Sequence, residues 1–302
     1  MDKVKELNTL LVCLDLTEID QYLIQYASFL SDALDTERVI FLHAIQAYDL
    51  PDKKSKKYPD LESSLSQTIR KEITQAVSER FHKGTKTEVI TKIEEEDAAD
   101  VIIDFTRKEE VDLTLIGRKF GEDRAGRYGR KIATQVNSDL MFVPENPEFS
   151  VEKILCAIDF SRESERAFQR AIDIQRFTGA ELSCHYVYDT SKSYFPATTL
   201  RSSSALEKKV HKKFRKFLKK FDMTPEQVSC HFELNDQITG HAERINRQAE
   251  EMESRLLIIG AKGQTSVVTS LLGNVTENIR RMDVEMPVMI MKNIKRKERD
   301  KY

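Results

Sequence analysis

The chain has 302 residues, of which 40% are hydrophobic and 32% charged, which is typical of a soluble globular protein with two domains of about 150 residues each. Lys plus Arg (48) nearly balance Asp plus Glu (50), so the net charge of -2 favours neither nucleic acid nor an anionic membrane as partner. No apolar run reaches the ~20 residues of a spanning helix, and the N-terminus lacks a secretory signal, so the expected location is cytoplasmic.

The first half of the chain predicts strands that alternate with helices. An apolar strand from Thr9 to Asp15 comes first, and a helical pattern follows from about Ile19 to Leu34. The next predicted strand is Arg38 to Ile45. Further along, Leu113 to Gly117 is a short apolar strand that ends in glycine, and Leu140 to Val143 is the last strand. Continuous apolar strands of this kind are typical of a buried parallel sheet.

The second half, after a proline-punctuated linker at residues 144–150, predicts the same alternation. Its strands are expected near residues 153–159, 181–188, 228–234, 256–260 and 287–291, and its helices near 163–178, 203–221, 239–253 and 274–282. We therefore expect an α/β protein with domains at 1–146 and 151–293 and a charged tail at 294–302. Each domain should hold a five-stranded parallel sheet with helices on both faces.

The two halves repeat one unit. Both first strands end in aspartate, and 144 positions separate Asp15 from Asp159. The strands LTLIG and LLIIG end in Gly117 and Gly260, which lie 143 positions apart. A register kept over so long a span indicates duplication.

Glycine is concentrated after the fourth strand of each half. Seven of the ten glycines lie there: Gly117, Gly121, Gly126 and Gly129 in the first half, and Gly260, Gly263 and Gly273 in the second. A glycine turn between a strand and a helix lets backbone N–H groups approach a phosphate, and the helix start adds partial positive charge. Ligands of open parallel sheets bind beyond the carboxyl ends of the strands, so we expect Asp159 in the same crevice.

These residues resemble the universal stress protein family in its tandem two-domain form, over nearly the whole chain. The family's ATP-binding pattern is G-x-x-G, nine residues, then G-[ST]. Here it is Gly260, Gly263, nine residues, Gly273 and then Asn274, whose amide can donate to a phosphate oxygen as a hydroxyl would. The resemblance implies two Rossmann/flavodoxin-like domains that form an intramolecular pseudo-dimer through their last strands, with a homodimer of whole chains as a further option.

The resemblance also implies the site residues and the ligand. The implied ligand is ATP, with or without a bound Mg²⁺. Asp159 would contact the ribose, and Tyr186 would line the adenine pocket, although ordinary core packing explains a tyrosine there equally well. The expected nucleotide-binding residues are Asp159, Tyr186, Gly260, Ala261, Gly263, Gly273, Asn274 and Val275.

The first half departs from this pattern. Phe120 stands where Gly263 stands in the second half, and Arg130 replaces Asn274. A bulky side chain where backbone must approach a phosphate argues against binding. The many basic residues of this segment favour a solvated basic loop over a looser anion site. The sequence therefore predicts at most one ATP per chain.

Other polar residues have simpler explanations. His43 and His185 end equivalent strands, and we expect both to be packed and bonded to backbone because no nucleophile or carboxylate partner is evident. The cysteines form no C-x-x-C pair, which indicates buried free thiols. Paired lysines on the helix at 203–221 indicate a solvated face: Lys208, Lys209, Lys212, Lys213, Lys219 and Lys220.

The leading hypothesis is a cytoplasmic stress-response protein that binds ATP in its second domain and acts as a nucleotide-dependent binding or signalling module. It would have no catalytic residues and no metal site, and its partner would be an unidentified protein. The alternative is a nucleotide-free dimeric scaffold or chaperone-like stress protein. A slow ATPase ranks third, because no Walker-type lysine or general base is evident.

Overall fold

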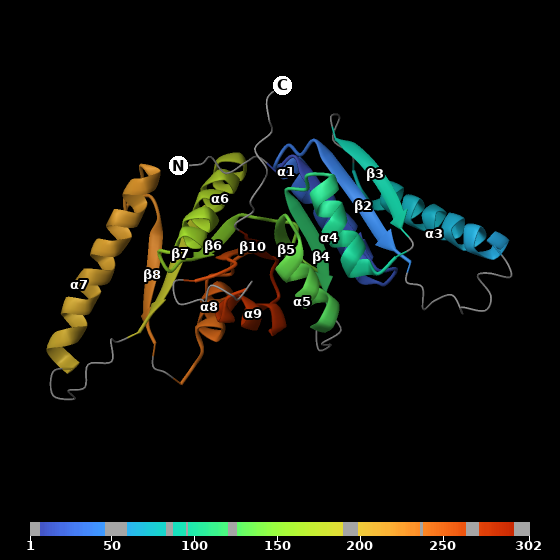
Figure 1. Cartoon of the computed structure of the whole chain (residues 1–302). Helices are drawn as coiled ribbons and strands as arrows, with labels where there is room; N and C mark the ends of the chain where they lie inside the picture. The colour runs from blue at the N-terminus through green and yellow to red at the C-terminus, as the bar shows by residue number, and fades with distance from the viewer. Residues whose placement is uncertain are drawn as a thin grey trace, which may run out of the picture. The chain divides into compact units, whose positions relative to one another are not determined.

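The computed structural model describes residues 7–45, 59–82, 87–94, 96–119, 126–189, 199–235, 238–263 and 272–292. It divides the chain into two compact units. The first comprises residues 1–149 with 285–287 and 292–302, and the second comprises residues 150–284 with 288–291. Each unit is an α/β fold with its own parallel sheet (Figure 1). Residues 294–302, predicted as a charged tail, lie outside the described residues.

The first unit has its strands in the order β3-β2-β1-β4-β5, all parallel. Helix α1 packs on β1 and β4 and touches α3, whereas α4 packs on β2 and touches α5. The two pairs cover opposite faces of the sheet, as right-handed crossovers require when strand order reverses (Figure 1). Its elements are β1 (Thr9–Leu14), α1 (Ile19–Ala33), β2 (Arg38–Ala44), α3 (Pro59–Arg80), β3 (Glu88–Glu94), α4 (Ala98–Lys108), β4 (Leu113–Arg118), α5 (Gly126–Gln135) and β5 (Asp139–Pro144).

The second unit repeats this arrangement, with strand order β10-β9-β6-β7-β8. Helix α6 lies over β6, β7 and β9, and α7 packs on α6 through Phe217 against Phe168, whose ring centroids are 5.2 Å apart. Helices α8 and α9 pack together, and α8 also touches β7. Its elements are β6 (Lys153–Ala157), α6 (Arg162–Thr178), β7 (Glu181–Tyr188), α7 (Thr199–Leu218), the 3₁₀ turn η4 (Lys219–Phe221), β8 (Ser229–Leu234), α8 (His241–Glu251), β9 (Leu256–Gly260), α9 (Asn274–Arg281) and β10 (Val288–Met291).

The central strands are buried almost completely, as their apolar sequences predict. Every residue of β10 is buried, and so is every residue of β9 except its last, Gly260. In the first unit, one apolar cluster joins β1 and β2 to the inner faces of α4 and α5, with Leu11, Ile40, Ile102 and Ile132 among its members. This burial on both faces explains why the strands lack the alternating pattern of a half-exposed sheet.

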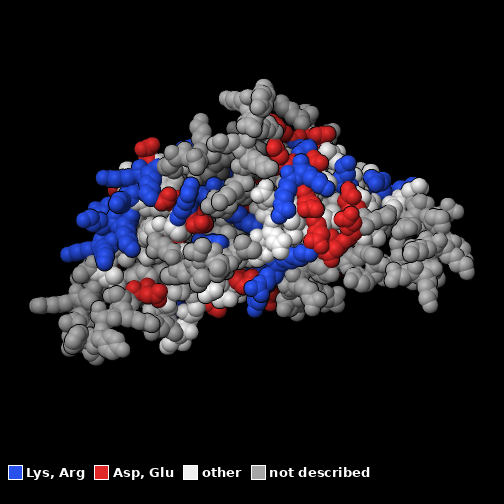
Figure 2. Space-filling view, in the orientation of Figure 1, with Lys and Arg blue, Asp and Glu red and all other residues white. Residues whose placement is uncertain are grey.

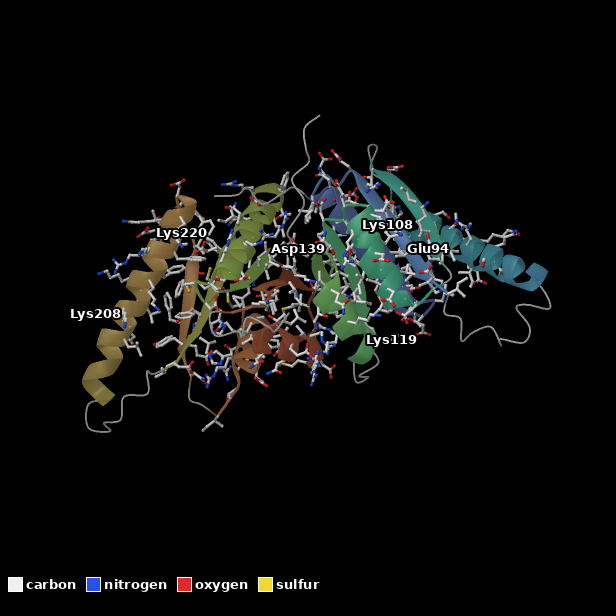
Figure 3. All side chains as sticks on the ribbon, viewed as in Figure 1. Glu94, Lys108, Lys119, Asp139, Lys208 and Lys220 are labelled. Carbon is white, nitrogen blue, oxygen red and sulfur yellow. The ribbon has the colours of Figure 1, made fainter. Side chains whose placement is uncertain are left out.

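Helix α7 separates apolar from basic side chains. Val210, Phe214, Phe217 and Leu218 are at most 4% exposed and face the unit's core. The six lysines predicted as a solvated face are all exposed, which confirms that prediction. Figure 2 shows Lys and Arg gathered over this helix, and Figure 3 labels Lys208 and Lys220 along it. Among the described helices, none combines the length and apolarity that a membrane span requires.

Several predicted boundaries differ from the structure, and two of these differences have a clear physical reason. The first strand of the second unit ends at Ala157, not at residue 159, because Phe160 adopts a left-handed conformation (φ 63°) that turns the chain. The helix expected at 203–221 begins at Thr199, and its last turn tightens into η4 before Asp222, which is also left-handed (φ 55°).

The duplication extends to the backbone torsions. Residues with positive φ recur at equivalent places: Leu16 and Phe160 after the strand-end aspartates, Asp35 and Gly179 after the first helix, and Glu110 and Glu253 before the fourth strand. The offsets are 144, 144 and 143 positions, as in the sequence. The chain therefore repeats even where the residue types have changed.

Candidate functional site

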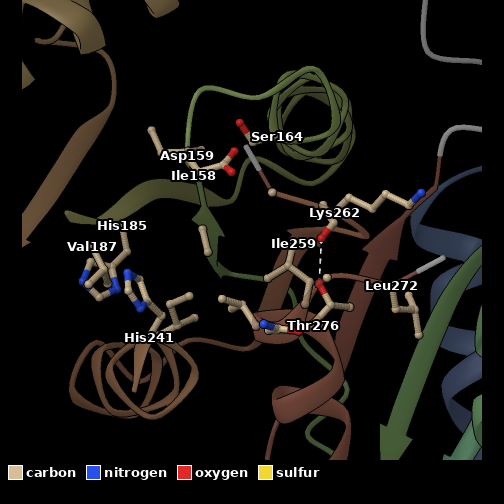
Figure 4. Close-up of a pocket in the computed structure, with 17 residues that line it drawn as sticks. Ile158, Asp159, Ser164, His185, Val187, His241, Ile259, Lys262, Leu272 and Thr276 are labelled. Carbon is tan, nitrogen blue, oxygen red and sulfur yellow. Dashed lines mark hydrogen bonds between the residues drawn. The ribbon is translucent and has the colours of Figure 1, made fainter. Parts of the chain in front are cut away.

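A cavity of about 200 Å³ opens in the second unit where β6 and β9 lie side by side and the strand order reverses. This is where open parallel sheets bind ligands. Six of the eight predicted nucleotide-binding residues line it: Asp159, Gly260, Gly263, Gly273, Asn274 and Val275 (Figure 4). The segment between two of the motif's glycines, residues 264–271, lies outside the described residues.

Asp159 and Gly263 meet at this cavity although 104 positions separate them in the sequence. Asp159 follows β6, and its carboxylate accepts a hydrogen bond from the backbone N–H of Ser161 at 2.9 Å. A Cβ added to Gly263 would lie only 2.7 Å from Oδ2 of Asp159. A side chain at this position would displace the carboxylate of Asp159, because the backbone approaches it closely.

Gly260 has a different reason to be glycine. A Cβ at this position would lie 3.0 Å from the backbone carbon of Glu163, in the first turn of α6. The equivalent Gly117 in the first unit packs in the same way, because a Cβ there would lie 2.8 Å from the side chain of Ile19 in α1. The first glycine of the motif is thus explained by helix packing in both units, including the unit whose loop departs from the pattern.

The start of α9 is tied to the end of β9 by two hydrogen bonds. The N–H of Gly273 donates to the carbonyl of Ala261 at 2.8 Å, and the hydroxyl of Thr276 donates to the carbonyl of Gly260 at 2.9 Å (Figure 4). These bonds fix the helix N-terminus, with its partial positive charge, at the cavity wall. Asn274 is the first residue of α9 and is exposed, so its amide is accessible at the cavity.

Two predicted residues are not part of the cavity lining. Ala261 is 4% exposed and holds the strand end through its backbone, whose N–H donates to the carbonyl of Met291 at 2.8 Å. Tyr186 packs against Phe160, with ring centroids 4.6 Å apart. Side chains alternate along a strand, so the neighbours of Tyr186 in β7, His185 and Val187, line the cavity instead.

His185 belongs to a charged network that the sequence analysis missed. It is 1% exposed, and its Nε2 lies 3.1 Å from Oε2 of Glu233 on β8. Arg244 and Arg247 of α8 form ion pairs with the other oxygen of Glu233. The pKa of His185 is lowered to about 4, mainly by burial and also by nearby His231, whereas Glu233 opposes the shift.

The two equivalent histidines are therefore bonded differently. Nδ1 of His43 lies 2.9 Å from the carbonyl oxygen of Leu14, which confirms the predicted backbone bond in the first unit. His185 pairs with a side chain instead, so the prediction was wrong for the second unit. No local signal could have found this partner, because Glu233 lies 48 positions further along the chain.

His185, His231 and Glu233 also have the composition of a metal site, with ligand atoms within 4.8 Å of one another. Two guanidinium groups on Glu233 already supply the positive charge that a cation would bring. We therefore assign the group to an ion-pair network. The four cysteines are free thiols, as predicted, but only Cys156 and Cys184 are buried, and Cys13 and Cys230 are half-buried. Burial raises the pKa of Cys156 and Cys184.

The equivalent region of the first unit is arranged differently. Lys119, which corresponds to Lys262, lies 3.9 Å from the carboxylate of Asp15. The hydroxyl of Thr17 donates to the same carboxylate at 2.5 Å. Phe120 lies outside the described residues, and Arg130 is exposed. Asp15 thus has an ammonium and a hydroxyl as side-chain partners at this place in the first unit.

Fold and site together define a class of protein: a tandem Rossmann-like α/β chain with a cavity at the switch point of its second sheet. The model of the universal stress protein family matches residues 6–144 and again residues 150–292. The chain therefore belongs to the universal stress protein family.

Solved structures agree with this assignment at the level of fold. A universal stress protein from Archaeoglobus fulgidus is similar over 95% of this chain and 99% of its own, with 21% identity and a TM-score of 0.68. A protein of unknown function from Pseudomonas aeruginosa is similar over 95% of this chain and 92% of its own, with 18% identity and a TM-score of 0.65. The comparison with curated proteins gives no match.

Proposed function

We propose that the second unit binds ATP and that the protein acts as a nucleotide-dependent binding or signalling module in a stress response. The observation that carries this proposal is the meeting of Asp159 and Gly263 at the cavity, where a Cβ would lie 2.7 Å from the carboxylate. A glycine that leaves room beside an aspartate suits a sugar–phosphate ligand, since hydroxyls can bond the carboxylate and phosphates can approach the backbone.

The cavity offers a different chemistry to each part of the nucleotide. The start of α9, with Gly273 and Asn274, provides N–H and amide donors for phosphates, and Lys262 adds a positive charge. Asp159 would accept hydrogen bonds from the ribose hydroxyls. Val187 and Ile245, both buried, give an apolar wall for a base.

We propose binding without turnover. The cavity wall of the described residues contains no arrangement of a nucleophile beside a base, and His185 is already paired with Glu233. The second candidate is a nucleotide-free scaffold. It is favoured by the packing role of Gly260, which explains one motif glycine without any ligand.

Two measurements test the proposal. Mass spectrometry of small molecules released from freshly purified, denatured protein should find adenine nucleotide. Calorimetric titration should show ATP binding to the parent and none to Gly263→Val, whose side chain would fill the space beside Asp159. A parent protein that carries no nucleotide and gives no heat with Mg-ATP would leave the scaffold as the better explanation.

A further inference from the structure

Two cysteines of the second unit lie side by side on neighbouring strands. In the parallel register of β7 and β8, Cys184 is the partner of Cys230. Side chains at register partners of adjacent parallel strands point to the same face of the sheet, so the two thiols are neighbours. The pKa of Cys184 is raised, mainly by burial and also by its hydrogen bond with the Cys230 thiol, which agrees with this placement.

The residue pairs on either side show how closely these two strands approach. One register position earlier, the hydroxyls of Ser183 and Ser229 are 2.7 Å apart. One position later, the rings of His185 and His231 have centroids 5.3 Å apart. Adjacent strands are about 4.8 Å apart, which lies within the Cα separations of about 4.4–6.8 Å that disulfides bridge. The backbone at the cysteine pair therefore already has a spacing that a disulfide can span.

The two thiols differ in their access to solvent. Cys184 is fully buried, whereas Cys230 is half-buried on β8, the edge strand of this unit's sheet. Sγ of Cys230 lies 3.7 Å from the carbonyl oxygen of His231, and this contact is exposed to solvent. A dissolved oxidant therefore reaches Cys230 first, and it affects Cys184 only through Cys230.

A third cysteine provides an internal comparison. Cys156 of β6 is the register partner of Cys184 on its other side, so the three thiols form one row across β6, β7 and β8. Cys156 is fully buried, as Cys184 is, so neither member of that pair meets an oxidant directly. Beside His43 in the first unit, the register partners are Leu42 and Lys92, so the fold itself does not require cysteines at this place.

We propose that Cys184 and Cys230 form a disulfide when the protein meets a hydroperoxide, which makes this pair an oxidant-sensitive modification site. The pair lies on the face of β7 opposite His185, because side chains alternate along a strand, and it is not part of the cavity lining. The proposal therefore stands whether or not the cavity binds ATP.

The chemistry takes two steps. The thiolate of Cys230 attacks one oxygen of the hydroperoxide, the O–O bond breaks, and Cys230 becomes a sulfenic acid while an alkoxide or hydroxide leaves and takes up a proton. The sulfur of Cys184 then attacks the sulfur of Cys230, and the S–O bond breaks as the S–S bond forms. The proton of Cys184 goes to the departing hydroxide, which leaves as water, so no free thiolate is needed in the buried position. Two thiols lose two electrons in total, and the hydroperoxide gains them.

The test uses the reduced full-length chain with hydrogen peroxide as the probe, under conditions that oxidise free glutathione. Unreacted thiols are then alkylated in denaturant, and the intact protein and its peptides are weighed by mass spectrometry. We expect the alkylated thiols to fall from four to two per chain, a linked peptide pair that contains Cys184 and Cys230, and recovery of all four thiols after dithiothreitol. Four thiols that stay alkylated, a disulfide between two chains, or a bond that includes Cys13 or Cys156 would each overturn the proposal.

Three serine variants assign the steps. Cys230→Ser should keep Cys184 as a free thiol after the same treatment. Cys184→Ser should accumulate a sulfenic acid at Cys230 that dimedone traps, whereas in the parent Cys184 consumes this intermediate. The matched control Cys156→Ser removes the third thiol of the row and should form the disulfide as the parent does. Equal dimedone labelling of the parent and Cys184→Ser would refute the role of Cys184, and the disulfide map of the parent decides the matter if a variant does not fold.

Discussion

Replacing Gly263 by alanine should weaken nucleotide binding, whereas replacing Gly260 by alanine should lower the stability of the fold, because the two glycines have different neighbours. In Gly263→Ala the new Cβ would lie 2.7 Å from Oδ2 of Asp159, so the carboxylate must move by roughly 0.7 Å to reach ordinary van der Waals contact. A side-chain carboxylate can rotate away, so the fold should lose at most its bond to Ser161, about 1 kcal/mol. Nucleotide affinity should fall about ten- to a hundredfold, because a charged hydrogen bond of about 1.5–3 kcal/mol is misplaced.

Gly260→Ala meets the backbone of α6 instead. Its Cβ would lie 3.0 Å from the backbone carbon of Glu163 and 3.2 Å from the carbonyl oxygen, and a helix backbone cannot rotate aside. Overpacking of this kind costs about 1–3 kcal/mol, which corresponds to a melting temperature lower by about 2–10 °C.

Thermal unfolding without ligand and calorimetric titration with Mg-ATP separate the two effects. We expect Gly263→Ala to melt within about 3 °C of the parent while binding ATP poorly, and Gly260→Ala to melt earlier. If Gly263→Ala binds ATP as the parent does, the carboxylate beside it has no role in the ligand site. If Gly260→Ala is as stable as the parent, the packing argument is wrong.

Three further predictions concern the same cavity. Asn274→Ala should weaken ATP binding about tenfold, and Asn274→Ser should bind ATP at least as well as the parent. The melting temperatures of the three ligand-free proteins should be equal, because Gly273 and not Asn274 is the N-cap of α9. A lower melting temperature for Asn274→Ala would indicate a capping role. Calorimetric titration should give one ATP per chain, because Phe120 and Arg130 stand in the first half where Gly263 and Asn274 stand in the second, and a stoichiometry of two equivalent sites would contradict this. As the pH falls from 7 to 5, His185 should become protonated in the unfolded protein but not in the folded protein, where its pKa is about 4. The free energy of unfolding, measured with urea, should therefore fall by up to about 2 kcal/mol more in the parent than in His185→Gln. Equal decreases in the two proteins would mean that the folded state does not keep this histidine neutral.

The fold could be predicted from the sequence because its signals are local. Each buried parallel strand is a continuous apolar run, such as LLIIG at β9, and each helix follows at a regular distance. The boundaries that differed depended on single backbone torsions. The positive φ of Phe160 turns the chain after β6. Among the residue types, only glycine predicts such a torsion reliably from the sequence.

The candidate site was predictable only in part. The motif places Gly263, Gly273 and Asn274 correctly at the cavity, because a glycine turn before a helix is a local pattern. On β7 the sequence left Tyr186 open between the adenine pocket and core packing, and the structure packs it against Phe160, since the sequence does not say which face of a strand meets the cavity. Strand alternation could have offered Val187 together with His185, because the two share one face.

Long-range partners account for the rest. His185 pairs with Glu233, which is also ion-paired with Arg244, and these three residues come from two strands and a helix. Gly260 shows the same limit. It lines the cavity as predicted, but the close packing of α6 is a second reason for its lack of a side chain, and that reason could not be seen in the sequence.

The repeated left-handed residues have a consequence for how ancient duplications are detected. Of the three equivalent pairs, only Gly179 is a glycine, and its counterpart is Asp35; the others pair Leu16 with Phe160 and Glu110 with Glu253. The main-chain path has therefore been inherited more faithfully than the residues that would make it easy to adopt. A comparison of backbone torsions along one chain would reveal such paralogous halves after their side chains have diverged beyond recognition.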